Sequence, residues 1–168
     1  MKKLIALFAA IVLVSGFTTV SAQVTATATG SATVITPIDI SKTNDMNFGN
    51  IAVSAAAGSV VLTPAGTRSI IGGVTLPAVV GSVAAAAFAV TGLGASTYSI
   101  SLPSTYSIDD RANHTMTVDT FTSTPSGTGT LTSGAQTIQV GATLNVVGAQ
   151  VAGTYTSGTG FPVTVNYN

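Results

Sequence analysis

The sequence contains no cysteine, no tryptophan and no glutamate. Without thiols the chain cannot bind zinc or an iron–sulfur cluster through cysteine, and it cannot use a thiol nucleophile. It also cannot use disulfides, which stabilise many small exported domains. A folded domain in this chain must therefore be stabilised by its apolar core or by partners.

Charge is scarce as well, with five Lys/Arg and five Asp/Glu in 168 residues. Two of the cations, Lys2 and Lys3, stand at the very start, so residues 23–168 carry three cations against five aspartates, a net charge of −2. A nucleic-acid-binding protein needs a basic patch that displaces counterions, and this sequence has none. Such low charge fits a protein that is packed against others.

The only histidine is His114, so one chain cannot form a two-histidine metal site. It follows Asp109 and Asp110, and serines are abundant, but no nucleophile-elbow motif is present and the acidic spacing of calcium loops is missing. We therefore interpret 109–114 as a polar loop. Gly72-Gly73 and Gly92-Leu93-Gly94 lack the lysine and spacing of phosphate loops and indicate turns or bulges. We predict no catalytic residue, cofactor, metal site or small-molecule substrate, and a protein that is not an enzyme.

The first 22 residues have the pattern of a secretory signal peptide. Two lysines precede an apolar run over 4–14, and small residues stand at 20–22. Cleavage after Ala22 would leave one domain's length of chain, exported to the periplasm and then to the cell surface or beyond. The next apolar run, 79–90, is too short for a membrane-spanning helix.

From residue 35 onward the sequence predicts an all-β domain, 35–168. Thr, Val, Ala, Ser and Gly dominate, and short alternating segments are separated by Gly/Ser/Thr/Pro clusters. The few aromatics and the short predicted strands favour a β-sandwich over an outer-membrane barrel. The predicted core consists of Phe48, Ile51, Leu62, Phe88, Val90, Ile100, Leu102, Val118, Leu144 and Val146.

A different pattern precedes this domain, in QVTATATGSATV at 23–34. Small apolar residues occupy every second position, namely Val24, Ala26, Ala28, Gly30, Ala32 and Val34. At about 3.3 Å per residue the segment would extend roughly 40 Å, longer than a usual sandwich strand. Three interpretations are open: a strand donated to another subunit, the domain's own first strand, or a disordered leader.

Several stretches of the domain resemble one bacterial family. They are ITPIDISKTNDMNFGNI (35–51), VVLTPAGTRSIIGGVTL (60–76), FAVTG (88–92), TYSISLP (97–103), VGATLNV (140–146) and the closing FPVTVNYN. Together they are similar to the family catalogued as domain of unknown function 4402, or DUF4402. The resemblance implies a small, exported, mostly β protein and implies no activity.

The two ends also resemble those of chaperone–usher fimbrial subunits. Such subunits are incomplete immunoglobulin-like sandwiches, completed first by a periplasmic chaperone and then by the N-terminal extension of the next subunit. This resemblance implies that 35–168 is an immunoglobulin-like β-sandwich, incomplete and completed by strand exchange, and that 23–34 is the donor strand. The groove-lining last strand would then present Phe161, Val163, Val165 and Tyr167. Many fimbrial subunits contain a disulfide, which this chain cannot form.

The leading hypothesis is therefore a structural subunit of a fimbria-like bacterial surface fibre that serves adhesion or biofilm formation. Its partners would be like subunits and a periplasmic chaperone. The alternative is a self-complete, secreted or cell-surface β-sandwich binding module that does not polymerise.

Overall fold

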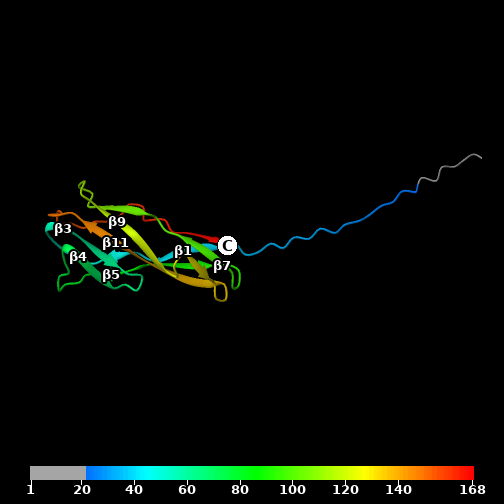
Figure 1. Cartoon of the computed structure of the whole chain (residues 1–168), viewed down its shortest axis with the longest axis horizontal. Helices are drawn as coiled ribbons and strands as arrows, with labels where there is room; N and C mark the ends of the chain where they lie inside the picture. Colours follow the sequence, from blue (N-terminus) through cyan, green and yellow to red (C-terminus); the bar gives the residue numbers. More distant parts are fainter. Residues whose placement is uncertain (1–21) are drawn as a thin grey trace, which may run out of the picture. The chain divides into compact units, whose positions relative to one another are not determined.

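A computed structural model describes residues 22–168, so the predicted signal peptide lies, except for Ala22, outside the described residues. The chain divides into two compact units, Met1–Val34 and Ile35–Asn168. Within the first unit, residues 22–34 form no strand and all their side chains are exposed. The second unit, called the body below, contains all the strands of the described chain (Figure 1).

The body is an antiparallel β-sandwich, and no helix occurs in residues 22–168, which confirms the predicted all-β class. Its strands are β1 (Asp39–Asn44), β2 (Asn47–Phe48), β3 (Ala52–Leu62), β4 (Arg68–Thr75), β5 (Val83–Ala84), β6 (Ala86–Thr91), β7 (Thr97–Ser101), β8 (Thr105–Asp109), β9 (Thr115–Thr124), β10 (Thr128–Thr130), β11 (Ala135–Val146) and β12 (Thr164–Tyr167). The prediction of uniformly short strands was wrong, because β3, β9 and β11 have 11, 10 and 12 residues. Each of the three contains a bulge or register shift, so its alternation is interrupted while the strand continues.

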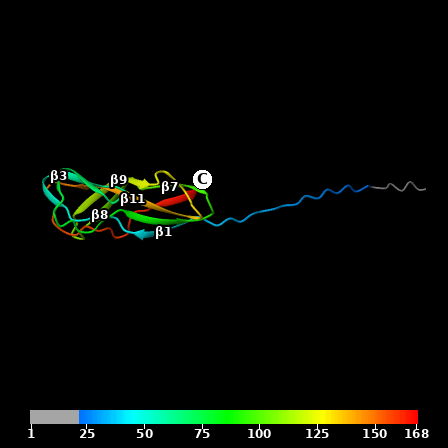
Figure 2. The same cartoon turned by 90° about the horizontal axis from the view of Figure 1, so that it is seen from below.

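Strand β11 is the centre of the main sheet (Figures 1 and 2). One edge of β11 pairs with β9, which in turn pairs with β8. The other edge pairs first with β6 and then with β3, and the change occurs at Gly141. A Cβ atom at 141 would lie 2.2 Å from the Leu62 carbonyl oxygen, so only glycine allows the end of β3 to approach this closely.

The second layer is smaller. It consists of β7 between β10 and β12, together with the two-stranded sheet β2–β5. The C-terminus accordingly lies beside β7 (Figure 1).

Two clusters of buried side chains form the core. The first cluster joins both layers, through β6 and β11 of the main sheet and β7 and β12 of the second layer. The second cluster is built from β3, β4, β9 and β11, all in the main sheet. It is covered by half-buried side chains, among them Phe48, Ile51, Tyr106 and Tyr155, and not by the three-stranded sheet. One half of the main sheet thus lacks a complete partner layer.

Six of the ten predicted core residues are buried, namely Leu62, Phe88, Val90, Val118, Leu144 and Val146. Phe48, Ile51, Ile100 and Leu102 are only half-buried, at the margins of the two clusters. The inward alternation of Met116 and Val118 in β9 does not continue to Thr120, which is exposed. Thr120 adopts φ 49° at a bulge in β9, and Phe121 takes the inward position.

The largest fully buried side chain is Tyr98, which is not among the ten predicted core residues. Its hydroxyl donates to Gln136 Oε1 at 2.6 Å, and the same oxygen accepts the Thr130 amide at 2.9 Å. Burial raises the pKa of Tyr98. A buried hydroxyl requires a hydrogen-bond partner. Because the partner of Tyr98 is Gln136 of β11, this bond links β7 in the second layer to the main sheet.

Candidate functional site

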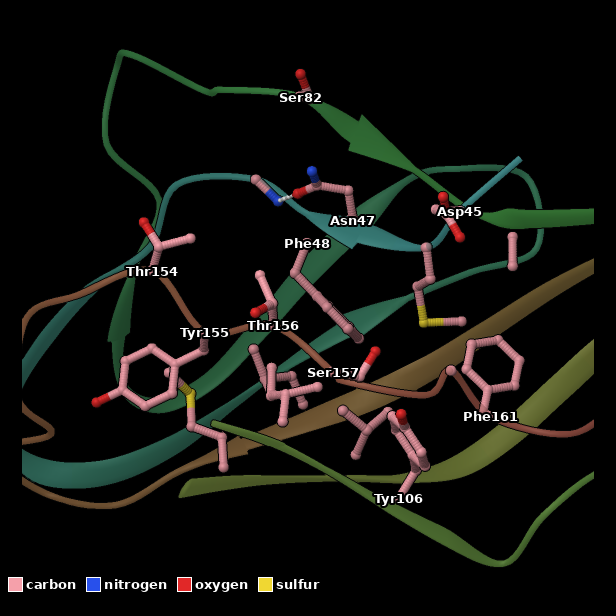
Figure 3. Close-up of a pocket in the computed structure, with 18 of the residues that line it drawn as sticks. Asp45, Asn47, Phe48, Ser82, Tyr106, Thr154, Tyr155, Thr156, Ser157 and Phe161 are labelled. Atoms are coloured by element: carbon pink, nitrogen blue, oxygen red, sulfur yellow. Dashed lines mark hydrogen bonds between the residues drawn. The ribbon is translucent and has the colours of Figure 1, made fainter. Parts of the chain in front are cut away.

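A groove of about 940 Å³ opens over the part of the core that lacks a complete second layer (Figure 3). Its floor consists of side chains from β6, β8, β9 and β11, namely Ala86, Phe88, Tyr106, Ile108, Met116, Val118 and Leu144. Two chain segments border it, one within 42–51 and the other over 153–161. We call these the N-terminal wall and the C-terminal wall of the groove.

The N-terminal wall is anchored at several points. The Arg68 guanidinium donates to the carbonyl oxygens of Phe48 and Asn50, the second at 3.0 Å. The Asn50 amide donates to the Val80 carbonyl at 2.8 Å, and the Asn50 side chain donates to the Val79 carbonyl at 3.1 Å. The wall therefore has a defined position without any occupant in the groove.

The C-terminal wall is held at its two ends. Thr156 and Asp109 exchange backbone hydrogen bonds of 2.8 and 3.0 Å. At the other end, the Phe161 ring lies 5.0 Å from the Phe121 ring and about 6 Å from those of Phe88 and Tyr106. Between these anchors, residues 157–160 are exposed and belong to no strand pair of the described chain. Their backbone makes no backbone–backbone hydrogen bond within the described chain.

The C-terminal residues predicted for the last strand all face the interior of the body. Val165 is buried, and Phe161, Val163 and Tyr167 are half-buried against the first core cluster. Only Thr164–Tyr167 pair as β12, with β7. Phe161 precedes that strand and lines the groove.

Tyr167 joins three parts of the body. Its hydroxyl accepts the Leu93 amide at 2.6 Å and donates to the Thr36 carbonyl at 3.0 Å. The hydroxyl occupies the space above Gly92, where a Cβ atom would lie 2.3 Å from it. This packing therefore requires glycine at position 92.

The residues predicted for the donor strand, Val24, Ala26, Ala28, Gly30, Ala32 and Val34, lie in the exposed, strand-free segment 22–34. The valines at its two ends are 91% and 96% exposed. A Cβ atom at Gly30 would meet no atom within 4 Å. The apolar face of this segment is thus uncovered in the described chain.

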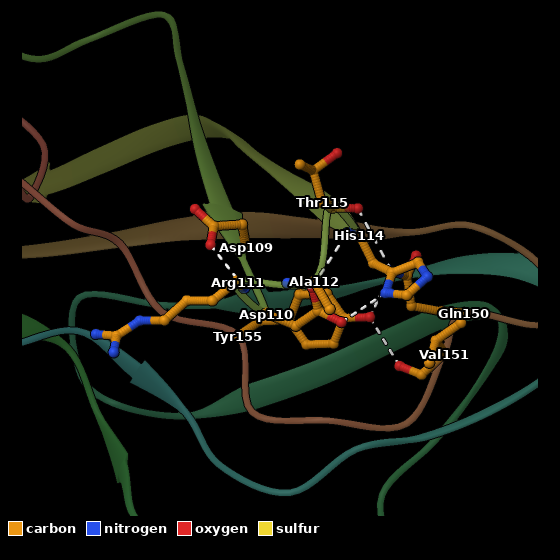
Figure 4. A network of polar contacts seen from close by, with 9 residues as sticks. All are labelled: Asp109, Asp110, Arg111, Ala112, His114, Thr115, Gln150, Val151 and Tyr155. Carbon is orange, nitrogen blue, oxygen red and sulfur yellow. Dashed lines mark hydrogen bonds and ion pairs between the residues drawn. The ribbon is translucent and has the colours of Figure 1, made fainter.

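The loop at 109–114 forms a polar network beside the C-terminal wall (Figure 4). Asp110 accepts hydrogen bonds from the amides of Ala112 and His114 and lies 2.6 Å from His114 Nδ1. Burial by itself raises the pKa of Asp110, but the hydrogen bonds from His114 and the two amides outweigh it and lower the pKa. Neither Asp110 nor His114 is hydrogen-bonded to a serine in the described residues.

Gln150 links the start of β9, which follows this loop, to the C-terminal wall: its Nε2 donates to the Thr115 carbonyl at 3.4 Å. Gln150 Nε2 also donates to the Tyr155 hydroxyl at 2.8 Å, and that hydroxyl donates to the Val151 carbonyl at 2.7 Å.

Within residues 22–168 no group of three His, Cys, Asp or Glu side chains could hold a metal ion. No helix in that part of the chain is long and apolar enough to cross a membrane.

Sequence reasoning assigned Phe161 to a groove, and it named five other groove-lining residues only as core, namely Phe48, Ile51, Phe88, Val118 and Leu144. It did not identify the remaining groove residues. Tyr106 and Ile108 alternate with Ser107, and this period-2 signal could have identified β8 as a half-buried strand. No local signal marks Arg68 as an anchor of the N-terminal wall, because its hydrogen-bond partners are 18 and 20 positions away.

The model of a family described as "Domain of unknown function (DUF4402)" matches residues 38–167. No curated protein and no solved structure matches the chain. The family match includes both walls, the floor and the C-terminal strand, and it leaves residues 23–34 outside.

Proposed function

The chain belongs to the DUF4402 family, and on that premise we propose that it is a structural subunit of a bacterial surface fibre, assembled by donor-strand exchange. The observation that carries the proposal is the groove of about 940 Å³ over the incompletely covered half of the core. A strand from a neighbouring copy would enter this groove and complete the second layer.

The groove provides what an added strand needs. The second core cluster is covered by four half-buried side chains, those of Phe48, Ile51, Tyr106 and Ile108. An inserted strand would bury their remaining exposed apolar area, and each Å² buried would stabilise the complex by about 25 cal/mol. Two segments of the described chain offer unpaired backbone. Residues 157–160 belong to no strand pair, and β1 pairs on one edge only, with β6. Each hydrogen bond gained there would contribute about 0.5–1.5 kcal/mol.

Segment 23–34 has the properties of the occupant. It has no charge, alternates small apolar residues with Thr and Ser, and exposes both kinds of side chain. Its extended length of roughly 40 Å exceeds the roughly 30 Å that the nine residues of the C-terminal wall would span as a strand. Small side chains suit a groove whose floor already contains large aromatic rings.

The remaining parts of the proposal follow from this exchange. The subunit acts by binding and not by catalysis. A periplasmic chaperone would fill the groove during export, and like subunits would fill it in the fibre at the cell surface, where the fibre serves adhesion or biofilm formation.

Cysteine trapping tests the proposal directly, because the natural chain contains no cysteine. One subunit carries Ala28→Cys in the donor segment, and a second carries Thr159→Cys in the C-terminal wall. Oxidation of the mixture should yield a disulfide-linked pair. The matched control replaces Thr159→Cys by Thr137→Cys on the exposed side of β11, which should not link.

A second measurement uses methionine oxidation. After the predicted signal peptide the only methionines are Met46 and Met116, and both line the groove. Assembly should slow their oxidation by peroxide, and removal of 23–34 should abolish both fibres in electron micrographs and this protection. The self-complete binding module would be favoured by two results together. The subunits would never form the disulfide-linked pair or fibres, and unrelated extended peptides would protect the methionines from oxidation.

A further inference from the structure

Arg68 is half-buried and makes an unusual pair of contacts for a cation. It begins β4, and its Nη1 donates to the carbonyl oxygens of both Phe48 and Asn50. The ion pairs of the described residues are Lys42–Asp45 and His114–Asp110, so no carboxylate lies within 4 Å of the Arg68 guanidinium. Its charge is directed at two neutral carbonyls of the N-terminal wall.

The geometry of the wall depends on this cation. The two carbonyls flank Gly49, whose φ of 67° turns the chain so that both oxygens point at the same nitrogen. A Cβ atom at 49 would lie 2.9 Å from Arg68 Nη1 and 2.5 Å from the Val80 carbonyl oxygen. Two carbonyl oxygens that converge on one point repel each other unless a donor lies between them, and a charged donor gives the stronger bonds.

The wall in turn determines the shape of the groove. Phe48 lines the groove, as Figure 3 shows, and packs against the second core cluster. Arg68 is anchored in the main sheet, where it pairs with Leu62 of β3. It thus connects a rigid strand to the turn that carries Phe48.

We propose that Arg68 is a positioning residue for the groove: it holds the Phe48–Asn50 turn in place before any strand is bound. This inference rests on the proposed function only for the identity of the occupant. A strand that binds to a preorganised groove does not have to order the wall, so it avoids that free-energy cost. If the wall becomes disordered, the apparent affinity falls in proportion to the fraction of molecules whose wall is still ordered.

The test compares Arg68→Met with the matched variant Arg111→Met in the full chain from Gln23. Both substitutions remove a guanidinium and keep the aliphatic stem, but the Arg111 side chain makes no hydrogen bond or ion pair in the described residues and does not line the groove. Arg68→Lys, which keeps a charged donor, serves as the conservative variant and as a substitute if Arg68→Met does not fold.

Two readouts separate the inference from the proposed function. Amide hydrogen exchange at 47–51 reports on the wall whatever occupies the groove, and disulfide trapping between a subunit with Ala28→Cys and a subunit with Thr159→Cys reports on strand exchange. If the ordered fraction of the wall falls to about a tenth, Arg68→Met should lower the rate of trapping by about tenfold. Exchange at 47–51 should then approach the rate of unprotected amides, because these amides would be open most of the time. Arg111→Met should change neither, and Arg68→Lys should recover part of both.

Unchanged exchange at 47–51 in Arg68→Met would overturn the inference, and so would faster exchange with unchanged trapping. Faster exchange in a chain whose parent never traps would support the role of Arg68 in the wall and refute donor-strand exchange.

Discussion

Replacement of Tyr167 by Phe removes one oxygen atom and two hydrogen bonds while the ring stays in place. The hydroxyl joins the Leu93 amide, at 2.6 Å, to the Thr36 carbonyl, at 3.0 Å. At about 0.5–1.5 kcal/mol each, the two bonds contribute about 1–3 kcal/mol. Leu93 is 40% exposed, so water can reach its amide and the loss should fall in the lower part of that range, about 1–2 kcal/mol.

Denaturant unfolding of Tyr167→Phe measures this loss, with Tyr106→Phe as the control. The Tyr106 hydroxyl makes no hydrogen bond within the described chain, so its removal should change stability by less than about 0.5 kcal/mol. For a body of this size, Tyr167→Phe should lower Tm by about 3–8 °C. A loss no larger than that of Tyr106→Phe would show that the two bonds do not stabilise the body.

A second substitution tests the packing of the same hydroxyl. A Cβ atom added at Gly92 would lie 2.3 Å from the Tyr167 hydroxyl and 3.2 Å from Cζ. Gly92→Ala should therefore cost about 1–3 kcal/mol in the natural background and less when residue 167 is Phe. The double-mutant cycle should give a coupling of about 1 kcal/mol, and simple additivity would contradict this geometry.

Three further predictions concern the body. Gly141→Ala should destabilise it by at least about 1–3 kcal/mol, because the added Cβ would lie 2.2 Å from the Leu62 carbonyl oxygen. In its control, Gly158→Ala, the Cβ meets open space, and unfolding curves should place it within about 0.5 kcal/mol of the parent. The lowered pKa of Asp110 means that this carboxylate stabilises the fold above its ordinary pKa, near pH 4, and that the stabilisation is lost as pH falls through the folded value. Asp110→Asn should therefore flatten the acid limb of a stability–pH profile, and an unchanged limb would refute the assignment. Phe88→Ala, at a position 9% exposed, should cost about 3–5 kcal/mol in the same unfolding assay, and a loss below about 1 kcal/mol would show that the ring is not part of the core.

The sequence by itself determined the secondary structure class and much of the C-terminal pattern. Alternation is a local property: neighbouring side chains of a strand point to opposite faces, so period 2 can be recognised without knowledge of partners. This is why short alternating segments between Gly/Ser/Thr/Pro clusters were enough to predict an all-β fold. The groove-lining role of Phe161 and Val165, in contrast, was inferred from the resemblance to fimbrial subunits. Local alternation fails where the backbone adds a residue, and Thr120 shows this: its positive φ shifts the inward position to Phe121.

Only the tertiary structure decided where the core is incomplete. The groove is bordered by 42–51 and 153–161, segments that are about a hundred residues apart, and its floor comes from four strands. Arg68 anchors the N-terminal wall because the β3–β4 hairpin places its guanidinium at two carbonyls of another turn. Gly141 is essential because β6 and β3 share one edge of β11. Such features depend on which strands pair and in what register, which is set by the packing of the whole body and not by any single stretch of sequence.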